Sequence, residues 1–226
     1  MLSCPPADRL LALLDQTQPV PGAQIIALEQ HVDYWNDLGW IDPFSSAQFS
    51  ERQQDYARSF HLVSAYTPQM VVDGQAEFVG SYERDALRAI AKEARAPKAT
   101  VDLEWRADSK AVPGTVPLHI GVRSYNGLNS EGVADVLLAV TENDLSSNVT
   151  RGENAGEQLY HRAVVRQLEV LGQLGSDGSF SAEFNLKLHT GWKPEKLRAA
   201  VFLQARRSRL VLGAAVLPLT APASGS

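Results

Sequence analysis

Residues 4–16, "CPPADRLLALLDQ", carry the signals that begin a helix and the apolar face that buries it. Cys4 lies at the expected start, and Pro5 follows at the first helical position, where a missing N–H costs nothing. Four leucines between Leu10 and Leu14 recur at helical spacing and predict a buried stripe. The stretch therefore predicts a helix that begins at the only cysteine of the chain.

The residues that follow alternate between strand and helix patterns. The apolar run Ile25–Leu28 is typical of a strand buried on both faces. Ser45, with Gln48 three residues later, is typical of a helix start. The expected order is a strand within 23–35, a helix within 45–62, a hairpin of strands at 67–74 and 76–80, and a helix within 81–95. Helix, strand, helix, hairpin and helix is the order of the thioredoxin fold, without the strand that would precede Cys4.

From about Ala99 onward, apolar and polar residues alternate. In residues 116–122, "VPLHIGV", every second residue is apolar, as on one face of a strand. About seven such segments, separated by Gly, Asp or Pro turns, predict an antiparallel β-sandwich. The expected fold is therefore α/β plus all-β. It comprises a thioredoxin-like domain at 1–97 without its amino-terminal strand, a β-sandwich domain at 98–220, and a flexible tail at 221–226.

Four long stretches carry a resemblance to a known family: "SCPPADRLLALL", "HVDYWNDLGWIDPFSSAQFSERQQDYA", "YTPQMVVDGQAEFVGS" and "RGENAGEQLYHRAVVRQLEVLG". Together they resemble the bacterial family catalogued as domain of unknown function 1223 (DUF1223), whose members are typically exported. The resemblance covers nearly the whole chain. It implies a thioredoxin-like domain followed by a β-rich domain, and it implies little about a reaction because the family has no assigned one.

The usual family motif reads Cys-Ser-Ser-Cys-Pro-Pro-Ala-Asp and follows a strand. Cys4 corresponds to its second cysteine, and Met1 stands where the first would be. We therefore expect that the first strand and the first cysteine are encoded upstream of Met1. The protein is then periplasmic or secreted, whereas it is cytoplasmic if Met1 is the real start.

Cys4 has two interpretations. As a redox thiol it would profit from the partial positive charge and free N–H groups of a helix start, which favour the thiolate. The resemblance makes it the resolving cysteine of a pair. Alone it can form a mixed disulfide but cannot complete a dithiol cycle, so any enzymatic activity would be only thiol–disulfide oxidoreductase-like. The other interpretation is a small apolar residue that packs under the helix and is inert.

Thr67 and Pro68 are the expected binding platform. The resemblance implies that Pro68 is cis and lies opposite the cysteine helix, with Thr67 offering backbone groups to a thiol or an extended peptide. An ordinary trans proline at a strand entrance is the alternative. Trp35 is expected either to line the binding groove or to serve in packing.

His31 and Asp33 stand two residues apart, so on a strand both face the same side. They lie at the end of the expected strand where open α/β sheets form ligand crevices. Structural hydrogen bonds are the preferred role, tuning of a thiol the second, and metal binding together with Cys4 the third. No metal or cofactor is predicted.

One loop interrupts the alternation of the second half. Arg151, Glu153, Asn154 and His161 crowd around two glycines, which is typical either of a binding loop or of a loop held by its own ion pairs. The second interpretation is preferred.

Composition limits the partners. A net charge of −5 argues against nucleic acid, because phosphate binding requires clustered Lys and Arg. No apolar run approaches the roughly 18–20 residues that span a bilayer. The leading hypothesis is thiol–disulfide exchange or thiol binding through Cys4 with a protein thiol or peptide. The alternative is a non-catalytic ligand- or protein-binding envelope protein that uses the thioredoxin fold as a scaffold.

Overall fold

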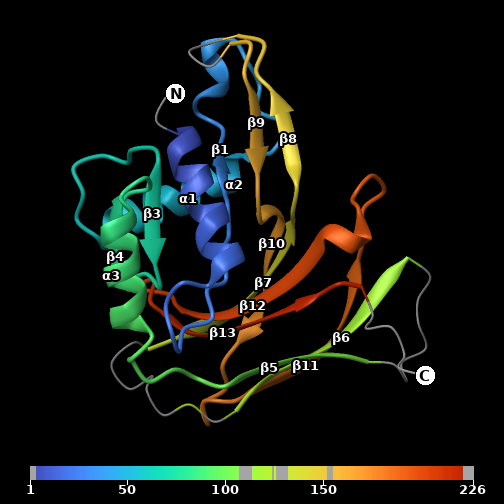
Figure 1. Ribbon diagram of the computed structural model, residues 1–226. Helices are drawn as coiled ribbons and strands as arrows, with labels where there is room; N and C mark the ends of the chain where they lie inside the picture. Colours follow the sequence, from blue (N-terminus) through green and yellow to red (C-terminus); the bar gives the residue numbers. More distant parts are fainter. Residues whose placement is uncertain (1–3, 107–113, 124, 126–131, 152–154, 221–226) are drawn as a thin grey trace. The chain divides into compact units, whose positions relative to one another are not determined.

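The computed structural model describes residues 4–106, 114–123, 125, 132–151 and 155–220 (Figure 1). These residues hold three α-helices and 13 strands in a mixed α/β arrangement with mostly antiparallel sheets. The chain divides into two compact units, Met1–Ala96 with Asn143–Val165, and Pro97–Glu142 with Arg166–Ser226. The first division lies one residue from the expected domain boundary. Residues 143–165, which we expected in the second domain, group with the first unit.

The first unit contains the helices α1 (Cys4–Thr17), α2 (Ala47–Ser59) and α3 (Glu83–Glu93). Helix α1 begins at Cys4 and buries Ala7, Leu10 and Leu14, which follow one another at helical spacing. Leu13 departs from the expected stripe, since its side chain is 47% exposed. Helix α2 is capped one residue later than expected, because the hydroxyl of Ser46 accepts the Gln48 N–H.

The expected hairpin forms. Strands β3 (Gln69–Val72) and β4 (Ala76–Val79) pair antiparallel around the Asp-Gly turn. Its apolar side chains pack with those of α1 and α3 in a small core built on Leu10, Leu14 and Ala86. This core holds the helix that carries Cys4 against the strand that follows Pro68.

The strand predicted within 23–35 is much longer than the strand that forms there. Only β1 (His31–Val32) is regular, and it pairs in parallel with β2 (Ser45–Ser46). Before it, Glu29 bonds through its backbone to Ala163 and Val165 at 2.9 Å each, while Ile25–Leu28 form no ladder in the described chain. An apolar run becomes a strand only where a neighbouring strand satisfies its backbone groups.

Residues 143–165 add a hairpin to the first unit, β8 (Leu145–Asn148) and β9 (Gln158–His161), which pair antiparallel. Figure 1 shows this yellow and orange hairpin beside the blue amino-terminal elements, and β9 contacts α1. Arg162 Nε lies 2.6 Å from the buried Asp15 carboxylate of α1. An ion pair thus joins two segments about 150 residues apart in the chain.

The second unit holds seven strands in two sheets. One sheet has the order β10-β7-β12-β13 and the other β11-β6-β5. Side chains of both sheets enter one core that includes Leu118, Leu138 and Leu203, all fully buried. The strands are β5 (Val101–Trp105), β6 (Thr115–Val122), β7 (Ala134–Glu142), β10 (Val164–Gln173), β11 (Phe180–Lys187), β12 (Leu197–Ala205) and β13 (Val211–Pro218). Within the described ranges, no helix is both long enough and apolar enough to cross a bilayer.

Candidate functional site

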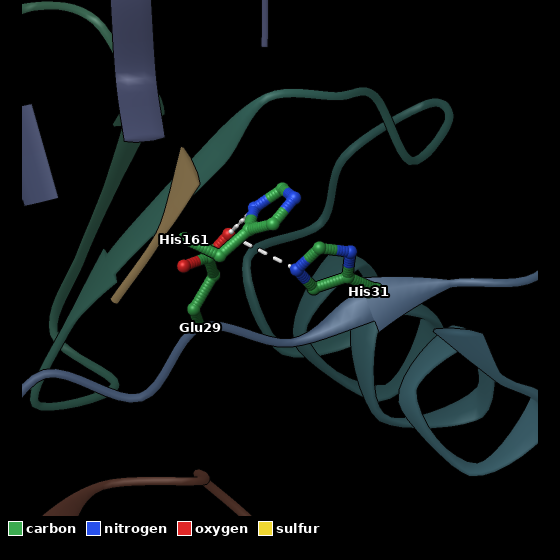
Figure 2. Close-up of side chains that lie close together, drawn as sticks. All are labelled: Glu29, His31 and His161. Carbon is green, nitrogen blue, oxygen red and sulfur yellow. Dashed lines mark hydrogen bonds and ion pairs between the residues drawn. The ribbon is translucent and has the colours of Figure 1, made fainter. Parts of the chain in front are cut away.

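Glu29 is the centre of a cluster in the first unit. One carboxylate oxygen, Oε1, lies 3.0 Å from His31 Nε2 and 2.9 Å from His161 Nδ1 (Figure 2). Figure 2 shows both imidazole rings turned toward this carboxylate, His31 from β1 and His161 from β9. Glu29 and His161 are buried, and the His31 side chain is 11% exposed. Two imidazoles and one carboxylate therefore converge out of contact with bulk water.

The remaining polar atoms of this cluster have partners of their own. His31 Nδ1 lies 2.6 Å from Asp42 Oδ2, and His161 Nε2 lies 2.9 Å from Ser147 Oγ. The second oxygen of Glu29 accepts the backbone N–H of Arg162 at 2.9 Å. These contacts hold each ring and the carboxylate in one orientation, which leaves Oε1 and the two inner ring nitrogens facing one another.

Phe44 covers the same rings. Its ring contacts His31 and His161 edge-on, with centroids 5.7 and 5.6 Å apart, and the two imidazoles themselves lie 4.8 Å apart. An aromatic cover lowers the local dielectric constant and thereby strengthens every charge interaction inside the cluster.

Three members of the cluster, Glu29, His31 and Asp42, are held in ionised form. Burial alone would raise the pKa of Glu29, but hydrogen bonds from His161 and His31 outweigh burial and lower that pKa to about 2. Burial alone would lower the pKa of His31, but its bonds to Asp42 and Glu29 raise it to about 10. Asp42 also has a lowered pKa, because its bond to His31 overcomes its own desolvation. His31 is therefore a cation between two carboxylates at neutral pH.

Cys4 and Asp8 lie within electrostatic reach of this cluster. Burial, followed by the negative charge of Asp8, raises the pKa of the Cys4 thiol to about 11, and Glu29 and Asp42 act in the same direction. Burial and the charge of Glu29 raise the pKa of Asp8 to about 7. The pKa of the thiol thus moves in the direction opposite to the one expected of a helix start, because desolvation and nearby carboxylates disfavour the thiolate.

The expected binding platform shares neighbours with Cys4. The Thr67–Pro68 peptide bond is cis, which confirms that prediction. Trp35 Nε1 donates to Thr67 Oγ1 at 3.0 Å, and Tyr34, whose hydroxyl also bonds to Thr67, lies within electrostatic reach of Cys4. Helix α1 also comes close to the proline, because a Cβ atom on Gly80 would lie in tight contact with both Ala7, at 3.1 Å, and Pro68, at 3.3 Å. Trp35 is 38% exposed, which argues against a role in core packing.

Asp33 does not join His31. It follows the end of β1, and its carboxylate accepts the hydroxyl of Ser50 on α2 at 2.5 Å. Its backbone N–H donates to the same hydroxyl at 3.0 Å. The pair expected to share one strand face is thus divided between two neighbourhoods, since the strand ends at Val32.

The structure adds four residues that reasoning from the sequence did not place at a site: Asp8, Glu29, Asp42 and Ser147. His161 was noted as part of a crowded loop, but its contact with Glu29 spans 132 residues and no local signal indicates it. Of that loop, Glu153 and Asn154 lie outside the described residues. A cluster of this kind can hold a charge, transfer a proton or bind a cation.

Comparison with known proteins agrees with this architecture. The family described as "Protein of unknown function (DUF1223)" matches residues 2–204. The crystal structure of protein AGR_C_4864 from Agrobacterium tumefaciens is similar, with a TM-score of 0.75 and 26% sequence identity, covering 98% of this chain and 90% of the other. No curated protein is similar enough to count as a match. Because the family match spans most of the chain, this protein belongs to the DUF1223 family.

Proposed function

We propose that this is a thioredoxin-like protein that exchanges or binds thiols by forming a mixed disulfide at Cys4. The observation that carries the proposal is that helix α1, which begins at Cys4, comes close to the cis Thr67–Pro68 bond, with Gly80 between Ala7 and Pro68. The order of helices and hairpin in the first unit supports the thioredoxin-like description. The single core between two sheets in the second unit supports a β-sandwich.

The reaction is a thiol–disulfide exchange. The Cys4 sulfur attacks one sulfur of an external disulfide, the external S–S bond breaks, and a new bond joins Cys4 to the attacked sulfur. The second external sulfur leaves and takes up one proton, which balances the proton that Cys4 gives up. The external partner is a disulfide of a protein or peptide held along Thr67 and Trp35.

Asp8 is the proton acceptor in this reaction. It lies four residues after Cys4, hence on the same face of α1 one turn away. Its pKa of about 7 matches a group that takes up a proton near neutral pH. The Cys4 thiol stays protonated at rest, and it gives its proton to this carboxylate only when a bound disulfide is attacked.

The rate of Cys4 with 4,4′-dithiodipyridine tests the proposal, because the chain has a single cysteine. A pKa raised from 9.0 to about 11 lowers the thiolate fraction at pH 7 about 100-fold and raises its intrinsic nucleophilicity roughly 10-fold. An unassisted thiol would therefore react about 10-fold more slowly in the native chain than in urea. We expect the native chain to react at least as fast as the unfolded one, and Cys4→Ser to abolish the signal.

The substitution Asp8→Asn separates proton transfer from simple repulsion. Loss of the base slows exchange several-fold, whereas loss of the negative charge alone would lower the pKa of Cys4 and accelerate exchange. A faster variant contradicts the proposal. Asp85→Asn, on the exposed side of α3, is the matched control and should react like the native chain.

Non-catalytic binding is the second candidate function. It is favoured by the raised pKa of Cys4, which keeps the thiol neutral at rest. This second function would be supported if Cys4 reacted with 4,4′-dithiodipyridine about 10-fold more slowly in the native chain than in the unfolded chain, and if Asp8→Asn left that rate unchanged. In that case the first unit is a scaffold and Cys4 an inert packing residue.

A further inference from the structure

We propose that Glu29, His31 and His161 bind a divalent transition-metal ion, for which Zn²⁺ is the natural probe. This metal site does not depend on exchange at Cys4. It rests on three ligand atoms, one from each residue, that lie within 4.8 Å of one another. Reasoning from the sequence gave metal binding by His31 only as a third interpretation, and it included neither Glu29 nor His161, which are brought together only by the returning β8–β9 hairpin.

Two of the three distances between ligand atoms suit a metal, and the third, within 4.8 Å between the two ring nitrogens, must shorten when both rings bind one ion. Zinc bonds of about 2.0–2.1 Å to nitrogen and oxygen separate neighbouring tetrahedral ligand atoms by about 3.3 Å. Glu29 Oε1 lies 3.0 Å from His31 Nε2 and 2.9 Å from His161 Nδ1, only a few tenths of an ångström closer. Three protein ligands leave one tetrahedral position for water or another donor, as in zinc sites that carry out chemistry.

The outer contacts are those that a metal site requires. A ligating histidine needs its other ring nitrogen held by a carboxylate, carbonyl or hydroxyl, which orients the ring toward the metal. Asp42 does this for His31 at 2.6 Å, and Ser147 does it for His161 at 2.9 Å. The Arg162 N–H occupies the second oxygen of Glu29, which leaves Oε1 as the one directed at both rings.

The charge and the choice of ligands favour a divalent transition metal. The carboxylates of Glu29 and Asp42 both lie within hydrogen-bond distance of the His31 ring, which is 11% exposed, so the surroundings favour a cation. Imidazole ligands select zinc and its neighbours over magnesium or calcium, which prefer oxygen. A plain network of His–Glu hydrogen bonds is the competing explanation, and it makes the opposite prediction for metal binding.

The test is zinc binding by the full chain after treatment with chelator and gel filtration. Calorimetric titration with Zn²⁺ is expected to show one equivalent, and Co²⁺ is expected to give the visible absorption of a four-coordinate site. Glu29→Gln and His161→Asn should remove this equivalent, and Asp42→Asn should weaken it by ~10- to 100-fold. A native chain that takes up neither Zn²⁺ nor Co²⁺ overturns the proposal even if the variants fail to fold.

Two further variants locate the binding. His119→Asn removes the histidine of a His–Glu pair in the second unit, where Glu183 lies 2.9 Å from the ring, and should leave zinc binding unchanged. Cys4→Ser should also retain the equivalent, so failure of thiol exchange and failure of metal binding are separate results. Loss of zinc binding in either variant would overturn the assignment to the three residues.

Discussion

His31 illustrates how a single buried side chain acquires its charge. Its two ring nitrogens face the carboxylates of Asp42 and Glu29, whose side chains are 20% and 10% exposed. A buried imidazole without such partners would lose its proton, because burial disfavours the charged form. Here two hydrogen bonds reverse that effect, and ion pairs offset part of the desolvation cost in the folded chain.

This charge predicts a pH dependence of stability in the metal-free protein. The pKa of His31 rises from 6.5 to about 10 on folding, so the folded state binds more protons between these values. The stabilisation is complete below pH 6.5 and is lost as the pH rises toward 10. We expect the free energy of unfolding, measured with urea, to fall by about 2–4 kcal/mol over this range.

The variant His31→Gln should flatten this alkaline decline, and His119→Asn, whose pair is on the surface, should retain it. An equal decline in His31→Gln would show that other groups cause it. The Asp8 carboxyl adds a decline of stability with rising pH at lower pH values. Because its pKa rises from 3.8 to about 7 on folding, stability falls through that range, and Asp8→Asn should be more stable above pH 7.

At the scale of elements, the β8–β9 hairpin contributes more to the site than any helix. It supplies His161 and Ser147, and the residue after it, Arg162, anchors it to α1 through Asp15. The Asp15 side chain is fully buried, so this ion pair acts at low dielectric constant. A hairpin inserted between two strands of the other unit thereby completes a site that the first 96 residues leave without His161.

The ion pair between Arg162 and Asp15 predicts that replacing Arg162 strongly lowers the stability of the protein. Arg162→Gln should lower the free energy of unfolding by about 2–4 kcal/mol, because weakening a buried ion pair leaves desolvation uncompensated. Arg58→Gln on α2 is the control: its pair with Asp55 is exposed, and its loss should cost about 0.5 kcal/mol or less. Equal effects of the two substitutions in urea unfolding would mean that the hairpin is not held by this contact.

At the scale of the whole molecule, the chain passes from the first unit to the second, returns at residues 143–165, and leaves again. Each unit has a core of its own, a small one around Leu14 and a large one around Leu138. The large core is formed by alternating residues of β6, β7 and β12, each buried by the opposite sheet. Its size makes the second unit the more sensitive to truncation of a side chain.

Leu138→Ala tests the large core. The side chain is fully buried in the central strand β7, so its removal should lower the free energy of unfolding by about 3–5 kcal/mol. Val170→Ala on β10 removes an apolar side chain that is 55% exposed and should cost less than about 1 kcal/mol. A small loss at Leu138, with an unchanged urea slope, would contradict a tightly packed core.

The sequence alone determined the features that depend on neighbours along the chain. The start of α1 at Cys4, the hairpin at its Asp-Gly turn, and the alternating strands of the second unit follow from local spacing. The error at Ile25–Leu28 has the same basis, because a local apolar run cannot indicate whether a partner strand is present. In the same way, the local sequence does not distinguish Ser45 from Ser46 as the residue that caps α2.

Only the tertiary structure decided which charged groups meet. Glu29 and His161 are 132 residues apart, and no spacing rule connects them. The pKa of Cys4 depends on burial and on carboxylates from three separate segments, whereas the sequence offered only the dipole of its own helix. Electrostatic interactions act through space and grow as water is excluded, so they are set by the folded arrangement and not by the order of residues.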